Sequence, residues 1–171
     1  MLARYFIELP LEVERVERAL LRAPETWVPG IAGEAGERGD ALLAEVGFGS
    51  ELRIARKVAV ELGRPVKMEA KTVVPLRWSP SAGQGLFPTL DADLEVAPLG
   101  THRTQLSMNA RYQPPFGQLG KMVDRALLHR VAEATIKDFL DRVGEAIAVE
   151  AGGSAPSPAP AGAMREEQHP G

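Results

Sequence analysis

The stretch TQLSMNARYQPPFGQLGKMVDRALLHRVAEATIKDFLDRVGEAIAV, residues 104–149, decides the fold. Its first ten residues alternate apolar and polar side chains, which predicts a half-buried strand. Beyond Gly117, apolar residues recur every three to four positions, which predicts one amphipathic helix of about thirty residues. Neither element can bury its apolar side alone, so we expect the helix to cover one face of a sheet. The expected apolar stripe of this helix is Met122, Ala126, Ile136, Leu140, Val143 and Ile147, widened by Ala132 and Phe139.

Shorter elements precede this stretch. The pattern predicts a strand over 4–9, a helix from Pro10, a second short helix from Pro24 to Val28, and a glycine-rich connecting loop over 30–39. Further strands are expected over 41–48, 52–62, 66–78, 86–96 and 104–113, with short turns between them, so the sheet is predicted to be an antiparallel meander. Pro75 and Pro88 lack an N–H group, so each must occupy an edge or a bulge.

Composition excludes several kinds of function. The 171 residues are 44% hydrophobic and 25% charged, with a net charge of −3 and no cysteine, which is typical of a globular domain without disulfides or thiolate metal sites. We find no basic block interleaved with aromatics and no apolar run of membrane-spanning length, so we expect neither nucleic acid nor a membrane span. The expected location is the cytoplasm. Residues 1–150 form one predicted domain, and the Pro/Ala/Gly-rich tail 151–171 is expected to be disordered.

The order of elements, with the junction YQPPFG at Tyr112–Gly117, resembles the START-related (SRPBCC) superfamily with the helix-grip fold. That superfamily includes bacterial polyketide cyclase/dehydrase-like proteins and lipid-transfer domains. The resemblance covers residues 1–150 and implies an α+β fold. In that fold a curved antiparallel sheet of about six or seven strands wraps on a long C-terminal helix, and two short helices follow the first strand. It also implies a mostly apolar cavity between sheet and helix. It implies no particular reaction, because members with this fold include both carriers and enzymes.

Inward-facing positions of the strands and the long helix, together with Trp27 at an expected end of the cavity, supply the candidate binding residues. They are Trp27, Ile54, Arg56, Val58, Met68, Thr72, Trp78, Leu90, Leu106, Met108, Tyr112, Met122 and His129.

Three of these residues could carry polar chemistry. Arg56 interrupts an inward-facing run, so its guanidinium either pairs, meets an anionic group of a ligand, or reaches water at the rim of the sheet. His129 lies one helical turn before Glu133, where it could act as an acid or base, or simply pair on the helix surface. Tyr112 offers a hydroxyl on an aromatic body, which suits the mouth of a cavity and equally a core. His129 and Tyr112 are the candidate catalytic residues.

Three hypotheses about function remain open. The first is a binding module for a small apolar or amphipathic molecule, lipid- or polyketide-like. The second is a cyclase, dehydratase or aromatase acting on a polyketide-like chain through His129 or Tyr112. The third is a structural protein whose core is filled. No cofactor is predicted, and the three histidines share no spacing that would hold a metal.

Overall fold

The computed structural model describes residues 2–45, 58–80, 89–113, 125–152 and 157–158. In chain order the elements are β1 (Leu2–Leu9), α1 (Val13–Leu20), α2 (Pro24–Glu45), β2 (Val58–Leu62), β3 (Val66–Lys67), β4 (Thr72–Pro80), β5 (Thr89–Pro98), β6 (Thr104–Gln113), α4 (Arg125–Glu150) and β7 (Ser157–Pro158).

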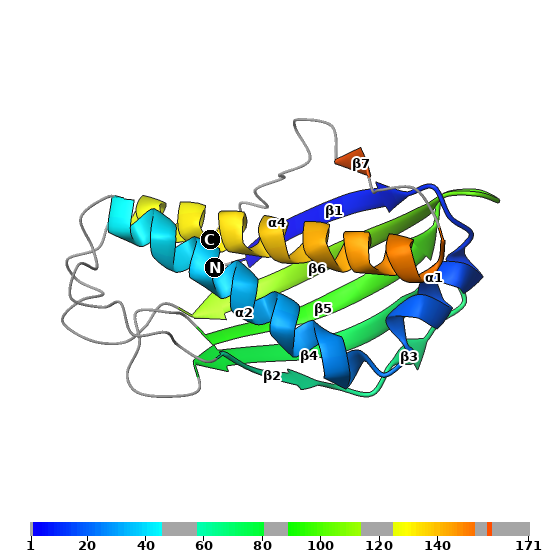
Figure 1. The fold of residues 1–171 in the computed structure, drawn as a ribbon, viewed down its shortest axis with the longest axis horizontal. Coiled ribbons are helices and arrows are strands. Elements are labelled where there is room, and N and C mark those ends of the chain that lie inside the picture. The colour runs from blue at the N-terminus through cyan, green and yellow to red at the C-terminus, as the bar shows by residue number, and fades with distance from the viewer. Residues whose placement is uncertain (1, 46–57, 81–88, 114–124, 153–156, 159–171) are drawn as a thin grey trace, which may run out of the picture.

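The strands of the described residues belong to one antiparallel sheet. Its order is β2-β4-β5-β6-β1-β7, with β3 also paired to β4. The long helices α2 and α4 lie over the same face of this sheet, which we call the inner face (Figure 1). The two helices cover different parts of that face, because α4 packs on β1 and β6 while α2 packs on β2. The predicted α+β helix-grip arrangement is therefore confirmed, with two long helices over the sheet instead of one.

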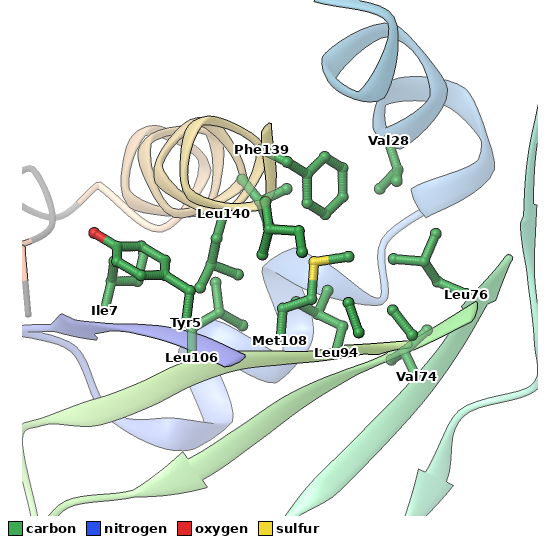
Figure 2. Close-up of a cluster of buried hydrophobic side chains, with 14 of the residues drawn as sticks. Tyr5, Ile7, Val28, Val74, Leu76, Leu94, Leu106, Met108, Phe139 and Leu140 are labelled. Carbon is green, nitrogen blue, oxygen red and sulfur yellow. The ribbon is translucent and has the colours of Figure 1, made fainter. Parts of the chain in front are cut away.

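The core lies between α4 and the inner face. Alternation along the strands turns Leu94, Leu106 and Met108 toward the helix, and all three are at most 1% exposed. Phe139 and Leu140 reach down from α4 to meet them (Figure 2). A fully buried side chain of this size contributes about 1.5–3 kcal/mol to folding. The helix stripe predicted from the sequence is buried at Ala132, Ile136, Phe139, Leu140, Val143 and Ile147.

The region after α1 differs from the prediction. In place of a short helix, a glycine-rich loop and a strand from residue 41, one helix, α2, runs from Pro24 to Glu45. Glycine and Pro29 disfavour a helix in isolation, so the local sequence pointed to a loop. Packing overrides that preference, because the buried side of α2 consists of small residues that let it lie close to α4. That side comprises Val28, Ala32, Ala35, Gly36 and Gly39.

The strand predicted over 66–78 is also wrong as one unit. The chain turns at residues 68–71, where the Met68 N–H donates to the Lys71 carbonyl at 2.8 Å, so β3 and β4 form a hairpin. The turn expected at residues 63–65 is instead a break between β2 and β3, which lie along the same side of β4. The Pro75 carbonyl accepts a bond from Gly63 N–H at 2.7 Å. The nitrogen of Pro75, which has no hydrogen to donate, points to the same side as this carbonyl and so faces the break. This position agrees with the expectation that Pro75 occupies an edge or a bulge.

Several expectations fall outside the described residues, namely those on 46–57, on Pro88 and on Met122. The disordered tail also stays a prediction, since the structure describes only Ala151, Gly152 and the pairing of Ser157 and Pro158 with Glu8 and Ile7 of β1.

Shortening the side chain of Leu140 tests the packing of α4. Leu140 is 0% exposed, so Leu140→Ala should lower the free energy of unfolding by about 2–5 kcal/mol. Equilibrium urea unfolding followed by tryptophan fluorescence measures the change. Leu99→Ala is the matched control, because Leu99 is exposed in a turn and should change stability by about 0.5 kcal/mol or less. Equal losses for the two variants would show that α4 does not bury this face.

Candidate functional site

Three inward-facing residues form a row at one end of the sheet. Backbone register places Trp78 of β4 opposite Leu90 of β5, and Leu90 opposite Tyr112 of β6. Their exposed fractions are 1%, 4% and 1%, so the row is enclosed. β4 ends and β5 begins at this end of the sheet, and α4 begins above it (Figure 1).

The next row along the sheet contains three alanines and Leu76. Ala92 lies opposite Leu76 and Ala110, and Ala110 lies opposite Ala3. Beside this row, Phe139 of α4 packs against Trp78. The two rings are 5.6 Å apart between centroids and inclined by 55°, a tilted aromatic pair. Trp78 is therefore packed against α4.

His129 of α4 lies beside the same row. Its ring is 6.4 Å from the Tyr112 ring between centroids and inclined to it by 25°. Its Nε2 atom is 2.9 Å from Oε1 of Glu133, one helical turn later. Its Nδ1 atom is enclosed and has no hydrogen-bond partner among the described residues. We call Trp78, Leu90, Tyr112 and His129 the aromatic end of the interior.

An enclosed polar atom without a partner is costly. Leaving such a group unsatisfied in a folded protein costs about 1–3 kcal/mol. The side chain of His129 is 34% exposed, so it spans the border between the row and the solvent, with Glu133 on its Nε2 side. The aromatic end can therefore offer one hydrogen bond to a polar group lying against an apolar, aromatic wall.

Two further candidates, Leu106 and Met108, lie in the middle of the core. Both are 0% exposed and packed against α4, so the structure makes them core residues in the described part of the chain (Figure 2). Met68 was expected to face inward and does not, because it lies in the β3–β4 turn and is 51% exposed. Ile54, Arg56 and Met122 lie outside the described residues. Val58 begins β2, and its side chain is also outside the description.

Thr72 lies at the far end of β4, six residues from Trp78 and thus about 20 Å away. Its hydroxyl donates to Glu17 Oε1 at 2.5 Å, and Lys67 Nζ lies 2.9 Å from Oε2 of the same carboxylate. Burial alone would raise the pKa of Glu17, but the bonds from Thr72 and Lys67 outweigh it and lower that pKa below its usual value. The buried Thr72 hydroxyl thus has a partner on α1, which ties this helix to the sheet.

Trp27 is also distant from the aromatic end. Its Nε1 donates to the Arg22 carbonyl at 3.3 Å, and it lines a surface hollow of about 410 Å³ with Ile147 near the C-terminal end of α4. Ile147 lies 18 residues after His129, about 27 Å further along the helix. The two tryptophans therefore mark different places in the fold.

Two larger hollows also lie away from the inner face. One, of about 650 Å³, is bounded by Arg15, Arg18 and Arg22 of α1 and its end, beside Glu150. Arg22 pairs with Glu150 at 2.6 Å, and Arg15 donates to the Ala151 carbonyl, so two of these arginines hold the C-terminal end of α4. The other, of about 510 Å³, lies over the polar outer face of β4, β5 and β6 and includes the Arg77–Asp91 pair.

A polar cluster that the sequence did not suggest joins β1 to α4. The Tyr5 hydroxyl donates to Asp141 Oδ1 at 3.3 Å, and Lys137 lies 5.3 Å above the Tyr5 ring while pairing with Asp141 at 2.5 Å. Burial, and then the Asp141 charge, raise the pKa of Tyr5, while the hydrogen bond to Asp141 raises the pKa of Lys137. Only the Lys137–Asp141 spacing was visible in the sequence. The groups satisfy one another, so the cluster fastens α4 to β1.

Comparison with known proteins bears on the fold. No protein-family model and no curated protein sequence matches this chain. A conserved protein from Geobacillus kaustophilus is similar in structure, with a TM-score of 0.51 at 18% identity over 87% of this chain and 96% of the other. A Thermus thermophilus protein superposes with a TM-score of 0.47 at 14% identity, over 87% of this chain and 98% of the other. The Zhui aromatase/cyclase from Streptomyces sp. R1128 superposes with a TM-score of 0.40 at 12% identity, over 90% of this chain and 99% of the other. The first likeness shows a shared fold.

The described residues lack two kinds of arrangement. They hold no group of three or more histidine, cysteine, aspartate or glutamate side chains placed to bind a metal. Nor do they include a helix long and apolar enough to cross a membrane.

Replacing the Thr72 hydroxyl tests its structural role. A lowered pKa for Glu17 stabilises the fold at neutral pH, and this stabilisation is lost as the pH falls through the folded-state pKa. Thr72→Val should therefore lower the free energy of unfolding by about 1–2 kcal/mol at pH 7 and by clearly less at pH 3.5. Urea unfolding at the two pH values measures the change, with Thr101→Val in the exposed β5–β6 turn as control. A loss that is the same at both pH values would contradict the bond to the ionised carboxylate.

Proposed function

We propose that this protein binds a small amphipathic molecule at the aromatic end. The apolar body of the ligand lies against Trp78, Leu90 and Tyr112, and its polar group meets Nδ1 of His129. The observation that carries the proposal is the enclosed Nδ1 atom, which has no hydrogen-bond partner among the described residues. A ligand that supplies this bond removes the cost of the unsatisfied atom and gains affinity from it.

The rest of the interior supports this position. Around Leu94, Leu106 and Met108 the space beneath α4 is occupied by Phe139 and Leu140 (Figure 2). Among the described residues, no buried polar side-chain atom in this middle part lacks a partner, whereas the aromatic end holds Nδ1 of His129. At the aromatic end the row of Trp78, Leu90 and Tyr112 carries two polar tips among apolar surface, which is the usual composition of a small-molecule site.

The resemblance to START-related proteins agrees with this proposal. That resemblance implies an apolar cavity between sheet and C-terminal helix, within the unit of residues 1–150. A lipid-like or polyketide-like molecule would match the apolar wall of the aromatic end. The fold is compatible with a carrier as well as with an enzyme, so the residues must decide between them.

One observation favours an enzyme as the second candidate. Glu133 holds one nitrogen of His129 while the other nitrogen stays available beside Tyr112, which is how an acid–base histidine is oriented. A cyclase or dehydratase acting on a polyketide-like chain could use His129 to move a proton. Turnover of the bound molecule, lost in His129→Gln while binding persists, would favour this second candidate over a carrier.

Native mass spectrometry of the protein purified from its own host tests the binding proposal. The protein should carry a bound small molecule, and His129→Leu should lose it or bind it about tenfold more weakly, since one buried hydrogen bond is removed. His102→Leu is the matched control, because His102 is 79% exposed in a turn and should leave the bound fraction unchanged. The proposal fails if the protein carries no molecule, or if the two variants retain it equally.

A further inference from the structure

We infer that Glu133 fixes the tautomer of His129, so that Nδ1 is a hydrogen-bond acceptor and the ligand carries a neutral hydroxyl group. Phenols, enols and alcohols fit this description, whereas carboxylates and phosphates do not. The inference rests on the proposed function, since it names the class of molecule for that same aromatic end.

The orientation of the imidazole follows from one contact. Nε2 of His129 and Oε1 of Glu133 are 2.9 Å apart, a normal hydrogen-bond distance. Turning the ring over would exchange Nε2 for a carbon at this position and would lose that bond. The ring is therefore held with Nδ1 on the enclosed side, away from Glu133.

The carboxylate then determines where the hydrogen lies. An ionised carboxylate can only accept hydrogen bonds, so the nitrogen that faces it must carry the hydrogen. In a neutral imidazole the other nitrogen has a lone pair and no hydrogen. Nδ1 of His129 is therefore an acceptor, and only a ligand that donates a hydrogen bond can satisfy it.

The surroundings of Nδ1 argue against an anionic ligand. Trp78, Leu90 and Tyr112 carry no positive charge, and each is enclosed. A carboxylate placed here would meet the lone pair of Nδ1 in a low-dielectric setting, without a compensating cation from these residues. A hydroxyl loses less on leaving water and supplies the missing hydrogen.

Nuclear magnetic resonance of the free protein tests the tautomer without any ligand. Two-bond ¹H–¹⁵N correlations of the imidazoles at pH 8, where histidine side chains are in general neutral, distinguish hydrogen on Nε2 from hydrogen on Nδ1. The signal of His129 is identified by its loss in His129→Gln. We expect hydrogen on Nε2 in the wild type. Glu133→Gln should give a mixture of both tautomers, because an amide can donate or accept, while Glu145→Gln, exposed on the same helix, should change nothing.

Binding of three related probes then tests the ligand class. These are 2-naphthol, its methyl ether 2-methoxynaphthalene, and 2-naphthoate, titrated into the full chain at pH 8. The naphthol should bind about tenfold more tightly than the ether or the naphthoate, because it alone is an uncharged molecule with a hydroxyl donor. Glu133→Gln should reduce this preference to about threefold or less, and Glu145→Gln should preserve it.

The outcomes separate the two proposals. An ether or naphthoate that binds as tightly as the naphthol, or a His129 signal with hydrogen on Nδ1, overturns the inference while leaving binding at the aromatic end intact. Failure of all three probes to bind, together with hydrogen on Nε2, counts against aryl hydroxyl ligands and against the proposed function, and supports only the role of Glu133. Tight naphthol binding that Glu133→Gln weakens supports both.

Discussion

The contact between the apolar stripe of α4 and the inner face of the sheet is the interaction on which this structure depends. Ile136, Phe139, Leu140, Val143 and Ile147 are at most 1% exposed, and they cover side chains from β1 and β6. The rest of that face is covered by α2, which packs beside α4, and by α1, which packs on β5 (Figure 1). Small residues along α2 let the two helices lie close together, so both long helices share one sheet face.

This packing divides the interior into two parts. In the middle, Phe139 and Leu140 fill the space above Leu106 and Met108. Toward the start of α4 lies the row of Trp78, Leu90 and Tyr112, in which Trp78 also contacts Phe139. There the side chains of Trp78 and Tyr112 add polar groups to the apolar surface. Nδ1 of His129 has no hydrogen-bond partner in the described part of the chain. A filled core and the proposed binding site therefore lie side by side beneath the same helix.

The sequence predicted those parts of the fold that depend on regular alternation. β6 and the buried side of α4 agree with the pattern, because period two and period 3.6 leave little freedom once one face is apolar. It failed at α2, where glycines and Pro29 suggested a loop and packing on α4 made a helix. It failed again at residues 63–71, because a proline-associated break in a strand and a true turn have the same composition.

The candidate site was predictable only in part. Its residue types and the one-turn spacing of His129 and Glu133 were visible in the chain, and alternation placed Trp78 and Tyr112 inward. Which candidates come together was not visible, because it depends on register between strands. Thr72 and Trp78 share a face of one strand, yet one bonds to Glu17 and the other lies against Phe139. The burial of a single nitrogen atom, which carries the functional proposal, depends on side-chain geometry that no pattern records.

Methyl resonance spectroscopy on leucine-labelled protein tests most directly whether α4 divides the interior in this way. On addition of 2-naphthol, the methyl signals of Leu90 should shift, while those of Leu106 and Leu140, packed in the filled part, should stay in place. Shifts centred on Leu106 and Leu140, with Leu90 unchanged, would contradict the account, because they would put the ligand where α4 and the sheet leave it no room.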